Sequence, residues 1–137
     1  MIKNNYLLHH IVALFLLGFS SFSFSAQVCS LPENATPNVA KRYIQCLDSE
    51  INKVEQVQAT WILKRKFELT KIEEETGNTQ VLPLFMRSIS NHEKYIKSSC
   101  QWRYILKSPN GTAAAISYKL CEIELMKQFT DVLKIPL

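Results

Sequence analysis

Four cysteines are the residues of this chain whose type and spacing most directly predict chemistry. They are Cys29, Cys46, Cys100 and Cys121. A cysteine thiol can ligate a metal, act as a nucleophile or form a disulfide, and the redox compartment of the protein decides between these roles. The destination of the chain therefore has to be inferred first.

The N-terminal segment has the composition of a secretory signal peptide. Lys3 supplies a positive start, residues 11–19 form an apolar run too short to span a bilayer, and small residues follow at Ser25 and Ala26. We expect cleavage there, which makes residues 1–26 the signal peptide. Export delivers the chain to an oxidising compartment, so the four cysteines are predicted to form two disulfides.

Residues 27–137 are predicted to form one small helical domain. No small-residue motif for lipid attachment precedes Cys29, so we expect a periplasmic or secreted protein without membrane insertion after signal cleavage. Loss of Lys3 with the signal lowers the formal net charge from +4 to +3, and this small excess is spread along the chain. We therefore expect no nucleic-acid partner.

Few residues of the chain could support catalysis. His92 is the only histidine after the predicted signal, because His9 and His10 lie within it. A single histidine cannot form a two-histidine zinc site, and oxidised cysteines leave no thiol for a Cys–His nucleophile pair. His92 lies between Ile89 and Ile96 at helical spacing, so we interpret it as a core or half-buried residue with a hydrogen-bond partner.

Two pairs of glutamates are the candidates for the paired carboxylates of a hydrolase. Glu50 and Glu55 are five residues apart, and Glu122 and Glu124 are two apart, so neither pair shares a helix face well. We interpret them as solvated surface residues. The sequence thus predicts no catalytic residue, no metal ligand set and no cofactor, and a protein that is not an enzyme.

An aromatic and cationic cluster is a candidate for recognition. Trp102, Arg103 and Tyr104 are consecutive, and Trp and Arg are common anchors of protein interfaces. The alternative is that Trp102 closes a helix hairpin near Cys100 while Arg103 is a solvated neighbour. Trp61, in the middle of the first helical segment, is interpreted as a core residue.

The elements that must position these residues are predicted to be three helices, an all-α up-down-up fold. Thr36 before Pro37 predicts a helix start, and Gly77 and Gly111 predict the two turns. The helices are expected over about 37–75, about 81–107, and from a Thr112 cap to about 133.

The first and last of these helices carry two more specific expectations. The first would be about 60 Å long, so we expect a kink or break between Lys64 and Leu69. The inward face of the last helix is predicted from three- and four-residue steps. Its predicted members are Ala114, Tyr118, Cys121, Leu125, Phe129 and Val132.

The predicted turns also select a disulfide pairing. Residues equidistant from the turn of a helix hairpin lie at the same height, and the midpoint of Cys100 and Cys121 falls in the turn before Gly111. The midpoint of Cys29 and Cys46 falls at the predicted helix start, where an extended arm can fold back. A Cys46–Cys100 pair would be mismatched by roughly 15 Å. We predict the pairs Cys29–Cys46 and Cys100–Cys121.

Three stretches resemble the family typified by the N-terminal domain of the lysozyme inhibitor LprI, which are small exported helical proteins with paired cysteines. The first is Cys29 and Cys46 ahead of Asp48-Ser49-Glu50-Ile51-Asn52, and the second is His92 to Cys100. The third is Gly111-Thr112 leading to Cys121. The family's Trp, Arg and Asp in the second stretch are replaced here by His92, Ile96 and Lys97.

The resemblance implies a non-catalytic binding role with a protein partner, and lysozyme inhibition in the cell envelope is the activity it suggests. Lysozymes are commonly basic, so such a contact would need a local acidic patch. Glu73, Glu74 and Glu75, beside the Gly77 turn, form the densest one. The alternative function is a small hydrolase of cell-envelope polymers, which would need a cleft joining carboxylates distant in sequence.

Overall fold

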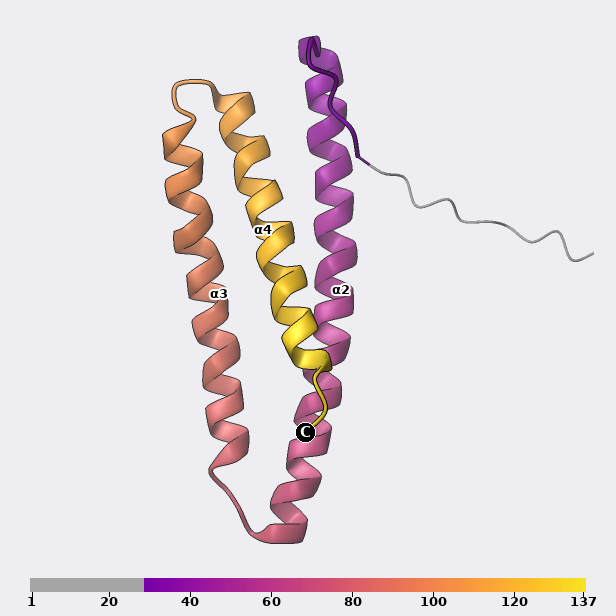
Figure 1. Cartoon of the computed structure of the whole chain (residues 1–137), viewed down its shortest axis with the longest axis vertical. Coiled ribbons are helices and arrows are strands. Elements are labelled where there is room, and N and C mark those ends of the chain that lie inside the picture. Colours follow the sequence, from indigo (N-terminus) through magenta and orange to yellow (C-terminus); the bar gives the residue numbers. More distant parts are fainter. Residues whose placement is uncertain (1–28) are drawn as a thin grey trace, which may run out of the picture.

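The computed structural model describes residues 29–137 as three helices in up-down-up order (Figure 1). They are α2 (Pro37–Thr76), α3 (Val81–Leu106) and α4 (Gly111–Lys134), and the described residues contain no strand. The all-α prediction is confirmed. The predicted signal peptide, 1–26, lies outside the described residues.

The ends of α2 follow from local chemistry. The Thr36 side chain accepts a hydrogen bond from the Val39 N–H at 3.4 Å, and Pro37 fills the first helical position, where its missing N–H costs nothing. At the other end Gly77 adopts a left-handed conformation with φ of 71°, and its N–H donates to the Glu73 carbonyl at 2.8 Å. The predicted turn at Gly77 is therefore confirmed.

Of the expected kink or break between Lys64 and Leu69, the break is wrong, because α2 is helical throughout its 40 residues. The reason is tertiary packing. Arg65 and Leu69 are both buried one turn apart on the same face, so this stretch of α2 is held by contacts that helix length alone does not reveal.

The cap of α4 also differs from the prediction. Asn110, not Thr112, is the capping residue, and its side-chain oxygen accepts from the Ala113 N–H at 3.0 Å. Asn and Thr are both good caps, so the sequence alone did not separate them. Pro83 lies in the first turn of α3, where its missing N–H leaves no helical hydrogen bond unmade.

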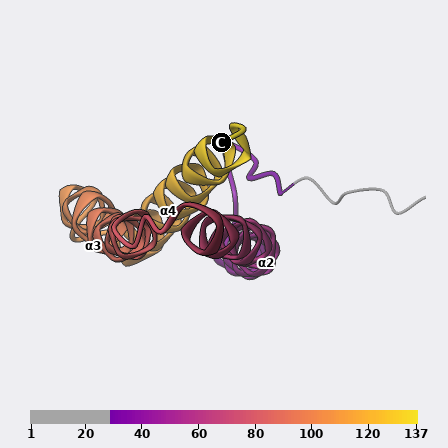
Figure 2. The same cartoon turned by 90° about the horizontal axis from the view of Figure 1, so that it is seen from below.

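The shortest helix, α4, is the centre of the packing. It lies to one side of the line that joins α2 and α3 and contacts both of them, whereas α2 and α3 contact each other far less (Figure 2). Its buried residues are Ala114, Ile123, Met126, Thr130 and Leu133. The single inward face predicted for this helix is thus incomplete, and Val132 is exposed.

Both predicted disulfides are present. Cys29 pairs with Cys46 at a Cα separation of 5.8 Å, and Cys100 pairs with Cys121 at 5.6 Å. Cys100 is fully buried and belongs to the core cluster with Leu47, Ile51, Val54, Ile96, Ile123 and Met126. Two such bonds indicate an oxidising compartment. None of the helices described here is long and apolar enough to cross a membrane.

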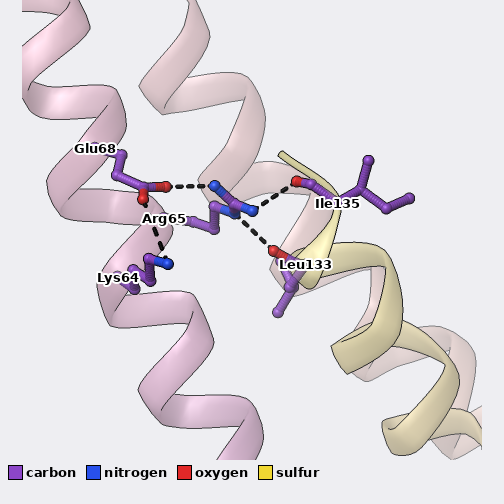
Figure 3. A network of polar contacts seen from close by, with 5 residues as sticks. All are labelled: Lys64, Arg65, Glu68, Leu133 and Ile135. Atoms are coloured by element: carbon purple, nitrogen blue, oxygen red, sulfur yellow. Dashed lines mark hydrogen bonds and ion pairs between the residues drawn. The ribbon is translucent and has the colours of Figure 1, made fainter. Parts of the chain in front are cut away.

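A buried arginine of α2 forms hydrogen bonds with the end of α4 (Figure 3). Arg65 Nε donates to the Leu133 carbonyl and a terminal guanidinium nitrogen to the Ile135 carbonyl, both at 2.6 Å, while the other terminal nitrogen contacts Glu68 at 2.5 Å. The last carbonyls of a helix have no partner within it, so the guanidinium satisfies them from outside. Arg65 is only 6 % exposed.

Candidate functional site: a groove between α3 and α4

Trp102 and Arg103 lie together at the surface near the end of α3. The Trp102 side chain is 52 % exposed, and the centre of the Arg103 guanidinium lies 4.7 Å from its ring centroid. This is cation–π stacking geometry. The interpretation of Trp102 as a side chain that closes the hairpin does not fit this exposure.

Trp102 forms part of a groove of about 600 Å³ between α3 and α4. From α3 come Tyr95, Ser99, Trp102 and Arg103, and from α4 come Ser117, Leu120, Cys121, Glu124, Leu125 and Gln128. Cys121 is disulfide-bonded to the buried Cys100, so a covalent link fixes the spacing of the two walls. The groove is therefore a preorganised concave surface, which lowers the entropic cost of binding.

The two charged residues of the groove, Glu124 and Arg103, differ in whether they already have a polar partner. Glu124 accepts a hydrogen bond from Gln128 at 2.7 Å within α4. Within residues 29–137, no carboxylate comes within 4 Å of Arg103. The groove thus offers a stacked cation and an aromatic face to a ligand.

The three predicted partner-binding glutamates lie elsewhere. They occupy the last turn of α2, at the end of the molecule opposite Trp102, and roughly 30 Å of α3 separates the two places. Glu74 and Glu75 are exposed and Glu73 is half-buried. Glu75 pairs with Lys71 at 3.6 Å. The two sets of candidate residues therefore form two surfaces.

The structure brings together acidic residues that sequence spacing did not pair. Glu122 of α4 lies near Glu55 and Asp48 of α2, and partial burial, with repulsion from both carboxylates, raises the pKa of Glu122 while nearby Lys119 lowers it. Lys119 also forms an ion pair with Asp48. This ion pair links α4 to α2. The groove at Trp102 includes none of the three acidic residues Glu122, Glu55 and Asp48.

His92 is half-buried, as predicted, but its environment is apolar. Its ring stacks on Phe129 of α4 with centroids 4.0 Å apart. The Nε2 atom is buried without a hydrogen-bond partner among the described residues, so the predicted partner of that atom is missing. Burial lowers the pKa of His92, opposed by the adjacent Glu93.

Trp61 is half-buried, so its interpretation as a core residue holds only in part. Lys64 Nζ lies 4.6 Å from its ring centroid. A second hollow of about 390 Å³ lies between α2 and α4, but its Glu50, Lys127 and Asp131 already form ion pairs. Over residues 29–137, no cluster of three His, Cys, Asp or Glu side chains has a geometry that could hold a metal ion.

Comparison of the chain with protein-family models, with curated proteins and with solved structures finds no match. The similarity to the LprI family therefore stays a hypothesis based on its short motifs.

Sequence reasoning missed two features of this region. Leu120 was not singled out, and Glu124 was discussed only as a possible hydrolytic acid, since only the hairpin register places these two residues in the groove wall beside Trp102. Arg65 was not singled out among the charged residues either. A signal was available, because Arg65 lies at helical spacing from Ile51, Ile62 and Leu69 on the apolar face of α2.

Proposed function

We propose that this chain is an exported, non-catalytic binding protein of the cell envelope, and that a protein partner contacts the groove between α3 and α4. The observation that carries the proposal is Trp102, a large aromatic side chain left half in solvent beneath Arg103. Trp and Arg are the residues most enriched in interface hot spots. A rigid concave surface around them supports recognition of a protein segment.

The test is a paired capture from envelope extract with immobilised wild-type protein and the Trp102→Ala variant. Phe67→Ala is the matched control, because Phe67 is also an aromatic residue and is exposed to 71 % on α2, outside the groove. We expect wild type and Phe67→Ala to capture the same partner. The amount captured by Trp102→Ala should be at least tenfold lower. Equal recovery by all three proteins would contradict the proposal.

Lysozyme is the partner that the family resemblance suggests. Its support in the structure is the position of Glu74 and Glu75, which project from the end of α2 beside an exposed turn. Such a tip can enter an enzyme cleft, and its charge complements a basic enzyme. This activity would use the α2 end and not the groove, so a lysozyme assay tests it separately.

The hydrolase alternative rests on one observation, the raised pKa of Glu122 near Glu55 and Asp48. A carboxyl group whose pKa is raised, close to a second carboxyl group, is the arrangement used in glycoside hydrolysis. An assay on purified cell-wall polymer with wild type and Glu122→Gln decides between the functions. Hydrolysis that the substitution abolishes would replace the binding proposal with the enzymatic one.

A further inference from the structure

The expectation that the positive excess is spread along the chain is wrong, because that excess is concentrated on the hairpin of α3 and α4. Between Glu93 and Glu122 the sequence has no Asp or Glu, and it contains Lys94, Lys97, Arg103, Lys107 and Lys119. Only Lys119 of these five is paired, with Asp48 of α2, in the part of the chain that the structure describes. By contrast, α2 has seven basic and seven acidic residues, and α4 has three of each.

The end of this hairpin is also apolar. Tyr104, Ile105 and Leu106 form the last residues of α3, and all three are exposed, Ile105 to 62 % and Leu106 to 69 %. Every residue from 101 to 112 is exposed. Residues 101–112 are called the hairpin tip below.

The arrangement of the apolar residues distinguishes between kinds of partner. Consecutive helical residues point about 100° apart, so Tyr104, Ile105 and Leu106 surround the end of α3 instead of forming one face. A protein surface that packs along an exposed helix covers one side of it. A bilayer interface can surround a helix end that enters it, and it favours Trp and Tyr beside Lys and Arg.

We propose that the hairpin tip docks end-on into the surface of a bilayer that contains anionic phospholipids, a peripheral membrane contact that departs from the expectation of no membrane insertion. Ile105 and Leu106 enter the interface, Tyr104 and Trp102 lie at headgroup level, and Arg103 and Lys107 contact phosphate groups. Dissolved salt screens the attraction between basic residues and anionic lipid, so this attraction acts only close to the bilayer surface. Docking in this orientation directs the α2–α3 turn, with Glu74 and Glu75, away from the bilayer (Figure 1).

This inference does not depend on the proposed protein partner, although Trp102 and Arg103 belong to both surfaces. The tip variants described next leave Tyr95, Leu120 and Glu124 of the groove unchanged. Failure of membrane docking would leave the groove proposal intact, and loss of a protein partner in Trp102→Ala would leave the tip proposal intact.

The experiment is cosedimentation of the exported, disulfide-bonded protein with vesicles of phosphatidylglycerol and phosphatidylethanolamine, and with neutral phosphatidylcholine vesicles. The test variant is Ile105→Ser with Leu106→Ser. The control is Leu63→Ser with Phe67→Ser, because these two residues are exposed to 68 % and 71 % on the outer face of α2. Circular dichroism checks that both variants stay helical.

We expect wild type and the α2 control to bind anionic vesicles at least tenfold more tightly than neutral ones, with loss of binding in high salt. We expect the tip variant to bind anionic vesicles at least tenfold more weakly than wild type.

A second measurement follows the fluorescence of Trp102. In Trp61→Phe, which keeps Trp102 as the only tryptophan, anionic vesicles should shift the emission to shorter wavelength. Absence of binding to anionic vesicles at low salt would overturn the proposal, as would equal loss in the two serine variants. Capture of an acidic protein without vesicle binding would overturn it too.

Discussion

At the scale of single residues, Arg65 is the side chain on which we expect stability to depend most. Replacing it by Met keeps the apolar stem but leaves two carbonyls of the α4 end and the Glu68 carboxylate without their partner. We expect Arg65→Met to lower the free energy of unfolding by about 3 kcal/mol. Lys66→Met, at an exposed neighbouring position, should change it by less than about 0.5 kcal/mol in the same denaturant titration.

His92 makes stability depend on pH with a defined sign. Its pKa is lower in the folded protein than in the unfolded chain, so the unfolded chain binds the proton more readily. The contribution of neutral His92 is complete above about pH 6.5 and is lost as the pH falls from there through the lowered folded pKa. We expect thermal melts of His92→Phe to lose this part of the pH dependence.

Removing the His92 ring has a separate effect on packing. His92→Ala deletes the stack on Phe129 and should lower the melting temperature while partner affinity stays within a few-fold. Loss of binding at unchanged melting temperature would instead place His92 in the recognition surface.

Glu122 should show the opposite dependence on pH. Its folded pKa is raised, so its protonated form favours the folded state, and this stabilisation disappears as the pH rises through the folded pKa. Glu122→Gln, which cannot ionise, should therefore be more stable than wild type at neutral pH. A less stable variant would indicate that the contacts of ionised Glu122 outweigh its burial.

At the scale of elements, Asn110 and Thr112 offer a test of how α4 begins. Asn110→Ala removes the hydrogen bond to the Ala113 N–H and should cost about 1 kcal/mol. Thr112→Ala should cost little, since its side chain does not cap the helix. The reverse order in chemical denaturation would restore Thr112 as the cap.

The Cys100–Cys121 disulfide joins α3 to α4 beneath the groove. The double change to serine should lower stability by roughly 3 kcal/mol and should also weaken partner binding, because the groove walls lose their fixed spacing. Peptide mapping without reduction checks the pairing itself, and a peptide linking Cys46 to Cys100 would contradict this topology.

Much of the fold could be predicted from the sequence because its signals are local. Thr36, Gly77 and the turn before Gly111 set the helix ends, and they also place the cysteines at matching heights. The central position of α4 could not be predicted in this way. Its second buried face, with Ile123 and Met126, depends on which helices touch, and the spacing of apolar residues along one helix does not contain that information.

The candidate site could be predicted only in part for the same reason. Trp102 and Arg103 were identified by residue type, but the groove around them exists because α4 supplies Leu120 and Glu124 across the hairpin. The separation of Trp102 from Glu73, Glu74 and Glu75 is likewise a property of the whole fold.

At the scale of the whole molecule, opposite ends carry opposite local charge. The α2 end has the three glutamates and the α3–α4 hairpin has the cations. If a basic lysozyme is the partner, changing all three glutamates to glutamine should weaken inhibition and flatten its dependence on salt. Unchanged inhibition would remove this patch from the mechanism, and no inhibition by wild type at low salt would remove lysozyme as the partner.

The central claim is that a protein partner sits in the groove between α3 and α4, and site-specific photo-cross-linking tests it most directly. A photoreactive residue at Gln128 lies in the groove, and one at Gln56 is exposed on α2 outside it. We predict a cross-linked partner from position 128 that is absent from position 56 and is lost when Trp102→Ala is added. Equal adducts from both positions, or an adduct that persists without Trp102, would contradict the account.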